Sequence, residues 1–264
     1  MIKQAGAKGM EVKRVNVLGV EISSINMAQA LAVFQEWIDH KSRQYVCVTP
    51  AHAVMDCYRD RSLRRVFNES GLTTPDGMAI VWLLRLNGER HVGRVYGPDL
   101  MKEVCRVSVQ KGWSHFLYGG EPGVAECLKA SLEAQYNGLR VVGTYSPPFR
   151  ALSDEEDREV IASINRTSPD IVWVGISSPK QERWMHDHLG KLDASVMVGV
   201  GAAFDFLSGR KPQAPSWIQR IGMEWFFRLS KEPGRLWPRY SQYPLFVVLA
   251  IAQLTGLRRF PVGD

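Results

Sequence analysis

The sequence lacks long apolar runs and contains few cysteines. The 264 residues include 4 cysteines, too far apart for a CxxC pair or a zinc-knuckle spacing. We expect them to be reduced thiols in the core of a cytosolic protein: Cys47, Cys57, Cys105 and Cys127. Residues 1–20 have no long apolar run, so a secretory signal peptide is not expected.

The motifs of several enzyme classes are absent as well. The sequence contains no HExxH, P-loop or GxSxG motif. It contains no Asp-x-Asp pair either, which is the usual metal clamp on a sugar-nucleotide diphosphate. If the chain handles such a diphosphate, arginines or helix dipoles must neutralise it. We therefore expect no metal and no other cofactor.

The composition is globular, but the charge is placed unevenly. Hydrophobic residues make up 45% of the chain and charged residues 23%, which excludes disordered and collagen-like classes. Residues 1–209 hold 24 basic and 24 acidic side chains, whereas residues 210–264 hold nine basic and three acidic ones. The net charge of +6 thus lies entirely in the last fifth of the chain, which is also rich in aromatic residues. This asymmetry indicates an anionic partner: nucleic acid, a phosphate-bearing substrate or an anionic membrane surface.

Strand-like and helix-like segments alternate up to about residue 205. The β-rich runs are Val15–Val20, Tyr45–Thr49, His115–Tyr118, Arg140–Tyr145, Ile171–Ile176 and Val196–Val200. The helix-like segments are Met27–His40, His52–Arg59, Gly77–Leu86, Asp99–Lys111, Val124–Tyr136, Asp154–Asn165 and Gln181–Leu189. The alternation predicts an α/β domain over residues 1–209, with a Rossmann-like parallel sheet and helices on both faces.

The pattern changes in residues 210–264, which we predict to be a basic, aromatic-rich helical appendage. Ser216–Leu229 is predicted to be one amphipathic helix. Leu245–Leu257 is apolar but shorter than the roughly 20 residues of a spanning helix. It is compatible with a helix docked on the core or with a segment lying on a membrane.

Polar and glycine residues follow several predicted strands. Asp76 could cap the next helix or could accept a proton from a substrate hydroxyl. Gly119 and Gly120 would let a phosphate approach the next helix, or simply form a tight turn. Because ligands of open α/β sheets bind outside the carboxyl ends of the strands, we expect Thr49, Asp76, Gly119 and Gln181 to converge there. His52 is interpreted as an interior or rim histidine whose hydrogen bonds are satisfied.

Six stretches resemble the WecG/TagA/CpsF family of glycosyltransferases, which act in bacterial cell-surface polysaccharide synthesis. They occur in the family's order at Thr74–Trp82, Arg94–Met101, Phe116–Gly123, Val174–Glu182, Gly199–Gly209 and Gly222–Leu229, followed by Glu232-Pro233. The resemblance implies an inverting, metal-independent transfer from a UDP-sugar to a saccharide on a polyprenyl diphosphate. It places the enzyme peripherally at the cytoplasmic face of the bacterial inner membrane. Homo-oligomers are compatible with it.

The resemblance also assigns roles to residues. Asp76 matches the proposed catalytic base, and Thr49, Arg94 and Gln181 match positions linked to binding or catalysis. Arg228 and Arg235 match appendage arginines that reach the donor diphosphate, and Arg239 substitutes for a third because Pro238 stands in its place. We expect substrate contacts from Gly77, Gly119, Gly120, Ser178, Lys180, Arg228, Arg235 and Arg239.

The transferred sugar is left open by the sequence. Pro50-Ala51-His52-Ala53 departs from the Asn- and Glu-containing segment of many relatives, which faces the donor sugar. Glucose, N-acetylmannosamine and its uronic acid all fit the family, and we lean towards glucose or another plain hexose.

Two other classes of protein stay open. A Rossmann-type oxidoreductase would fit the alternation but lacks the GxGxxG fingerprint and a ribose-binding carboxylate. A nucleic-acid-binding protein would fit the basic tail, but residues 1–209 are electrically neutral and contain no known reading module, so we expect no nucleic acid partner.

Overall fold

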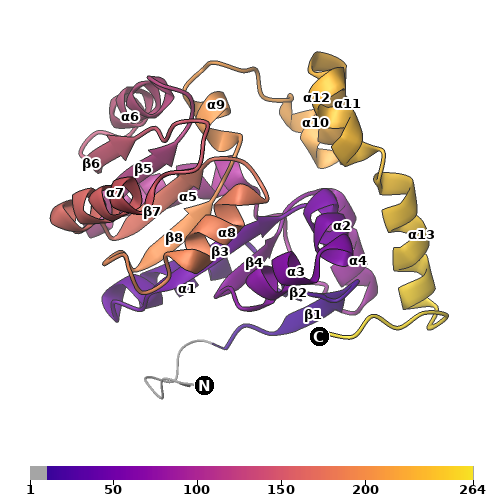
Figure 1. The fold of residues 1–264 in the computed structure, drawn as a ribbon. Coiled ribbons are helices and arrows are strands. Elements are labelled where there is room, and N and C mark those ends of the chain that lie inside the picture. The colour runs from indigo at the N-terminus through magenta and orange to yellow at the C-terminus, as the bar shows by residue number, and fades with distance from the viewer. Residues whose placement is uncertain (1–10, 264) are drawn as a thin grey trace.

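Six parallel strands form the central sheet of the computed structural model, which describes residues 11–263 (Figure 1). Residues 1–10, on which part of the signal-peptide prediction rests, lie outside the described residues. The strand order is β4-β3-β8-β7-β5-β6. The bounds are β3 (Gln44–Thr49), β4 (Leu72–Pro75), β5 (Ser114–Gly119), β6 (Arg140–Tyr145), β7 (Ile171–Gly175) and β8 (Val196–Gly199).

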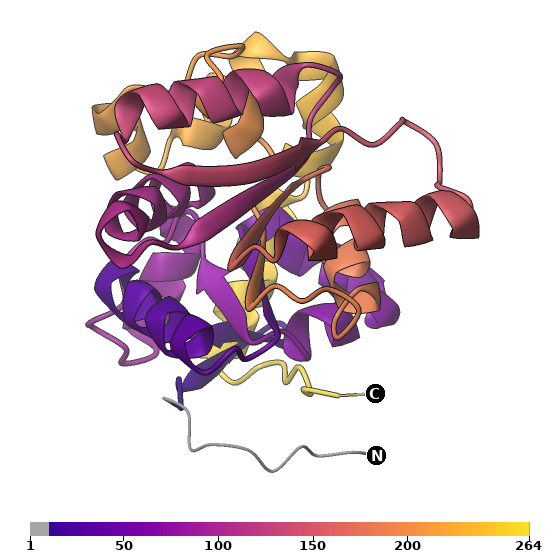
Figure 2. The same cartoon turned by 90° about the vertical axis from the view of Figure 1, so that its left-hand side faces the viewer.

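Helices cover both faces of this sheet, as predicted (Figures 1 and 2). One face carries α2 (Ala51–Arg59), α3 (Arg61–Asn68), α4 (Met78–Leu86), α7 (Asp154–Thr167) and α8 (Lys180–Asp187). The other face carries α1 (Met27–Asp39), α5 (Gly97–Lys111), α6 (Val124–Gln135) and α9 (Ala203–Leu207). Along β7, Ile171 and Trp173 enter one core cluster and Val172 and Val174 the other, all fully buried. This confirms the α/β sandwich predicted from its apolar strands.

The predicted strand Val15–Val20 is wrong, because the chain reverses within it. Leu18 and Gly19 both have positive φ angles, of 51° and 91°. Two consecutive residues in this region form the tight turn of a hairpin. The hairpin consists of antiparallel β1 (Arg14–Val17) and β2 (Val20–Ser23). Two elements were not predicted. The edge strand β4 has only four residues and ends at Pro75. The helix α3 has five polar side chains among its eight residues, so it lacks a clear apolar pattern.

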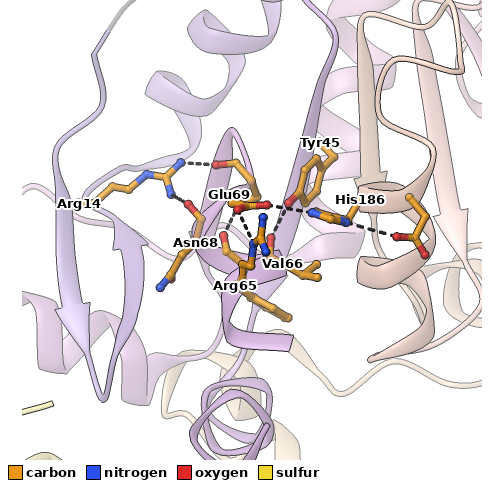
Figure 3. Close-up of polar contacts among 10 residues, drawn as sticks. Arg14, Tyr45, Arg65, Val66, Asn68, Glu69 and His186 are labelled. Atoms are coloured by element: carbon orange, nitrogen blue, oxygen red, sulfur yellow. Dashed lines mark hydrogen bonds and ion pairs between the residues drawn. The ribbon is translucent and has the colours of Figure 1, made fainter. Parts of the chain in front are cut away.

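Polar contacts hold α3 and the turn after it between the hairpin and α8 (Figure 3). Arg14 donates from Nη1 to the carbonyl oxygen of Asn68 at 3.0 Å. On the opposite side, Nε2 of His186 lies 2.9 Å from Oε2 of Glu69. The Tyr45 hydroxyl donates to a main-chain carbonyl oxygen of α3 at 2.5 Å. These contacts hold the turn between α3 and β4, the edge strand that leads to Asp76.

The described residues of the appendage form four helices. They are α10 (Ser216–Arg220), α11 (Glu224–Lys231), α12 (Pro233–Tyr240) and α13 (Tyr243–Leu254). The prediction of one helix over Ser216–Leu229 is wrong, because the chain turns at Gly222, whose φ is +74°. In Figure 1, α10 to α12 lie together near the carboxyl ends of the strands, and α13 runs down beside α2 and α4.

The helix α13 docks on the core by one side only. Phe246, Leu249 and Ala250 are buried against it. Its other side leaves five apolar side chains 40–61% exposed: Leu245, Val247, Val248, Ile251 and Leu254. Within residues 11–263, no helix is both long and apolar enough to cross a bilayer.

The cysteine prediction is correct for three of the four thiols. Cys47, Cys57 and Cys105 are buried, as expected of core residues. Cys127 is exposed on α6 instead. The buried face of α6 consists of Val124, Ala125, Leu128 and Leu132, and Cys127 lies outside it.

The loops after β5 and β7 leave the sheet towards opposite sides, because β5 leads to β6 and β7 leads back to β8. Such a divergence is where open α/β sheets bind ligands. The two loops touch here: the Gly120 amide donates to the Gly175 carbonyl oxygen at 3.1 Å. A Cβ atom on Gly119, whose φ is +141°, would lie 2.6 Å from that carbonyl group.

We expect Gly119→Ala to destabilise the protein more than Gly123→Ala does. Gly123 has a φ of +84° but open space around it, so its substitution costs only the backbone strain of about 1–2 kcal/mol. Gly119→Ala has a comparable backbone strain, and in addition its Cβ atom would overlap with the Gly175 carbonyl group. Thermal unfolding of both variants measures the difference. Equal melting temperatures would mean that the two loops do not approach this closely.

Candidate active site

A cavity of about 970 Å³ opens at the carboxyl ends of the strands. The loops after β4, β5, β7 and β8 line one part of it, and the appendage lines another. The predicted site residues that line it are Asp76, Gly120, Ser178, Lys180, Gln181, Arg228, Arg235 and Arg239. The predicted convergence at this edge is therefore borne out for the loops after β4, β5 and β7. Gly119 shapes the wall through its contact with Gly175.

Asp76 follows β4 and faces the cavity with a side chain that is 16% exposed. Burial raises the pKa of its carboxyl group to about 7, against the opposing effect of the Arg94 guanidinium. Arg94 Nε lies 3.7 Å from Asp76 Oδ1. Asp76 does not cap α4, because the N-cap is Gly77, with a φ of +86° and no capping side chain. The interpretation of Asp76 as a helix cap is therefore wrong, and its role as a proton acceptor stays a prediction.

Arg94 is held in place by the appendage. Its Nη2 pairs with Glu224 of α11, and its Nη1 donates to Gln219 Oε1 at 3.2 Å. Glu224 also accepts a hydrogen bond of 2.5 Å from the Tyr96 hydroxyl, and the Arg94 guanidinium lies 3.9 Å from the centre of the Tyr96 ring. Sequence reasoning missed Glu224, since no local pattern relates it to a residue 130 positions away.

Thr49 lies beneath the site rather than in it. Its side chain is fully buried, and its hydroxyl donates to the Cys47 carbonyl oxygen at 2.8 Å. Neither of the two cavities formed here by the described residues is lined by Thr49. Its carbonyl oxygen accepts from the Asp76 amide at 3.2 Å. In this arrangement Thr49 positions the loop of Asp76 through its main chain.

The first turn of α8, which follows the loop after β7, places two adjacent polar residues at the cavity: Gln181 in its wall and Glu182 behind it. Gln181 is 4% exposed, and its Nε2 donates to Glu182 Oε1 at 2.9 Å. Glu182 is fully buried, and burial raises the pKa of its carboxyl group to about 7. The sequence analysis did not single out Glu182, although it ends the same Pro-Lys-Gln-Glu stretch.

The three predicted appendage arginines reach the large cavity. Arg239 donates from Nη2 to the carbonyl oxygen of Ser178 at 3.0 Å, which joins α12 to the loop after β7. Arg228 is half-buried, with its guanidinium 5.5 Å from the centre of the Phe206 ring. Arg235 is exposed and pairs with Glu232. The cavity thus combines carboxylates of the sheet with cations of the appendage.

His52 differs from the expectation of a satisfied histidine. It is 8% exposed, and among the described residues its Nδ1 atom has no hydrogen-bond partner. Burial, together with the nearby Arg239 and Arg228, lowers the pKa of its imidazole to about 3. His52 is therefore a neutral ring beside Asp76 at the cavity wall.

The described part of the chain brings no three His, Cys, Asp or Glu side chains together in a group that could hold a metal ion. The carboxylates of the cavity instead face arginines, as in the Asp76–Arg94–Glu224 cluster. That the enzyme needs no metal stays a prediction.

Comparison with known proteins identifies the family. The sequence profile of the "Glycosyl transferase WecG/TagA/CpsF family" matches residues 15–260. An N-acetylglucosaminyldiphosphoundecaprenol N-acetyl-beta-D-mannosaminyltransferase of Bacillus subtilis (strain 168) is 29% identical over 227 residues, 86% of each chain. Proteins of the same name from Bacillus spizizenii and Staphylococcus aureus (strain MW2) are 26% and 24% identical, covering 81% and 89% of this chain and 81% and 91% of their own. The resemblance found in the motifs is confirmed: the chain belongs to the WecG/TagA/CpsF family of glycosyl transferases.

Proposed function

We propose that this glycosyltransferase moves a sugar from a UDP-sugar to a saccharide carried on a polyprenyl diphosphate in the synthesis of a cell-surface polymer. The observation that carries the proposal is Asp76, a largely buried carboxylate whose pKa is raised to about 7, on the wall of a cavity that three arginines of the appendage also line. A general base works best when its pKa lies near the working pH. The family membership selects this reaction class over an oxidoreductase or a nucleic-acid-binding protein.

In the proposed reaction Asp76 is the general base. An acceptor hydroxyl attacks the anomeric carbon of the donor, and its proton passes to the Asp76 carboxylate. The bond from that carbon to the diphosphate oxygen breaks, and its electron pair leaves with UDP. Attack from the face opposite UDP inverts the anomeric configuration. A positioned base contributes on the order of 10²–10⁴ in rate, which is roughly 3–5 kcal/mol of the barrier.

The leaving UDP gains negative charge, and cations of the appendage stabilise it. Arg228, Arg235 and Arg239 line the same cavity as Asp76, and Lys180 lies at the start of α8. Charge-assisted hydrogen bonds from arginine to a diphosphate are stronger than neutral ones, and they act where the charge develops. The proposed enzyme needs no metal for this step.

The names of the relatives guide the choice of substrates. All three name an N-acetyl-mannosaminyl transfer and an N-acetylglucosaminyl diphosphate on undecaprenol. We therefore propose UDP-N-acetylmannosamine as the first donor to test, ahead of the plain hexose favoured by the sequence. A thermal-shift screen should include UDP-glucose and the uronic acid donor as well. A ligand that binds only the folded protein raises the melting temperature of the protein.

The lipid-linked acceptor implies work at a membrane surface, which we propose to be the cytoplasmic face of the bacterial inner membrane. Support comes from the exposed apolar side of α13, followed by Arg258 and Arg259. A contiguous exposed apolar surface beside cations is typical of peripheral membrane binding. Homo-oligomerisation stays a prediction.

The Asp76→Asn variant should lower transfer by about 10² or more, because the amide cannot accept the proton. It should also raise the melting temperature at pH 8. A folded-state pKa of about 7, above the ordinary 3.8, means that stability falls as the pH rises from about 4 through 7. The neutral amide removes this loss. Transfer near the wild-type rate would exclude Asp76 as the base.

The acid limb of kcat/KM should lie near pH 7 and should move in opposite directions in two variants. Glu224→Gln removes a charge that raises the pKa of Asp76, so the limb moves to lower pH. Arg94→Met removes the cation that lowers this pKa, so the limb moves to higher pH. Glu182→Gln is the control, because Glu182 also titrates near pH 7. Loss of the limb in this control would assign it to Glu182 and not to Asp76.

Addition of EDTA to the purified enzyme should leave turnover unchanged, because arginines neutralise the leaving diphosphate in the proposed mechanism. The measurement is the initial rate of transfer with and without chelator. Strong inhibition that Mg²⁺ or Mn²⁺ reverses would contradict the metal-independent mechanism.

A further inference from the structure

A second, smaller cavity of about 90 Å³ lies next to the large one. The two cavities share part of their walls, so they meet at the proposed base. The shared residues are Pro50, His52, Asp76, Tyr96 and Arg228. A carboxylate between two adjoining spaces can face a ligand in each of them.

The walls that are not shared differ in chemistry. Those of the large cavity include six carboxylates and six cations, the cations being Arg150, Lys180, Arg183, Lys211, Arg235 and Arg239. Those of the small cavity include Met78 and the rings of Trp225, Tyr240 and Tyr243. The Tyr243 ring centre lies 5.7 Å from that of Trp225 and 5.2 Å from that of Tyr240. The large cavity thus offers many charged groups to a polar ligand such as a diphosphate, whereas the aromatic rings of the small cavity suit a neutral ring with apolar faces.

Two cations line the small cavity, Arg94 and Arg228, and Arg228 is shared with the large cavity. Arg94 lines only the small cavity but is engaged by Glu224 and Gln219. Glu224 lines the same cavity and is 9% exposed. The one cation that only the small cavity contains is thus paired within the protein, so a neutral polyol fits this cavity better than a second nucleotide does.

The rim of the small cavity is apolar. The turn at Gly222 lies across α4, where an added Cβ would be 3.2 Å from both Met78 and Trp82. Around this turn Trp82 is 48%, Ile221 55% and Phe226 54% exposed. Large apolar side chains gathered beside a cavity mark a surface that a hydrophobic ligand covers.

We infer that the small cavity is the acceptor subsite: it binds the sugar ring of a prenyl-linked saccharide, with one hydroxyl at Asp76 and the prenyl chain along the rim of Trp82, Ile221 and Phe226. This inference rests on the proposed function and deepens it. In an inverting transfer the hydroxyl arrives from the side opposite the leaving diphosphate, and the large cavity holds that diphosphate. The rings of Trp225 and Tyr243 pack against the apolar face of the sugar.

The test is to place a large side chain in the small cavity by substituting an exposed residue, because the core does not depend on such a residue. Ala79 is exposed on α4 and lines only the small cavity. Ala162 is exposed on α7, lines neither cavity and provides the matched control. Two ligands are titrated calorimetrically into the full-length protein: UDP, and an N-acetylglucosaminyl diphosphate carried on a farnesyl chain.

Ala79→Trp should weaken binding of the farnesyl-linked probe at least tenfold and change the Kd of UDP less than twofold, whereas Ala162→Trp should change neither. Trp225→Ala should weaken the same probe without filling the cavity. Arg235→Ala should weaken the binding of UDP and leave the binding of the acceptor probe unchanged.

Unchanged binding of the acceptor probe to Ala79→Trp and Trp225→Ala, with UDP still bound, would overturn the acceptor subsite alone. A wild-type protein that does not bind UDP would overturn the proposed function and this inference with it.

Discussion

The ion cluster of Asp76, Arg94 and Glu224 is the interaction on which the site depends. Arg94 lies between two carboxylates, 3.7 Å from Asp76 and paired with Glu224. Glu224 belongs to α11 of the appendage, while the other two residues follow β4 and α4. The position of Arg94, and with it the charge around Asp76, therefore depends on the docking of the appendage. Removal of Arg94 from this buried cluster would leave two carboxylates without their shared cation, so the charge of Arg94 is needed by both.

Two opposing effects act on Asp76, and their balance decides its chemistry. Burial disfavours the carboxylate and raises its pKa, whereas Arg94 and Arg228 favour the carboxylate. Burial is the larger effect, so the pKa rises to about 7 instead of falling below 3.8. A fully solvated aspartate would be a weak base for a sugar hydroxyl. The same burial makes the ionised form destabilising, which is a common feature of catalytic carboxylates.

The appendage links this chemistry to a surface. Its α12 supplies Arg235 and Arg239 to the large cavity, and α13 docks by one side while the other stays exposed. The contact of Arg239 with the Ser178 carbonyl joins α12 to the loop after β7. In the proposed mechanism, the appendage that would meet a membrane through α13 thus also completes the donor site through α12. A lipid-linked acceptor and the cations for the leaving group would then be brought together at one edge of the sheet.

The sequence by itself determined the α/β sheet, the family and most of the loops of the site. Strands buried on both faces are apolar throughout, and polar or glycine residues follow them, so β7 and the loops of Asp76, Gly120 and Gln181 could be predicted locally. The hairpin turn at Leu18–Gly19 and the break at Gly222 were missed, because positive φ angles do not alter the hydrophobic pattern. Only the tertiary structure decided that Glu224 holds Arg94, that Thr49 lies beneath the cavity and that the His52 ring is neutral. These properties arise from contacts between distant segments and from burial, which is a property of the folded chain and not of any local stretch.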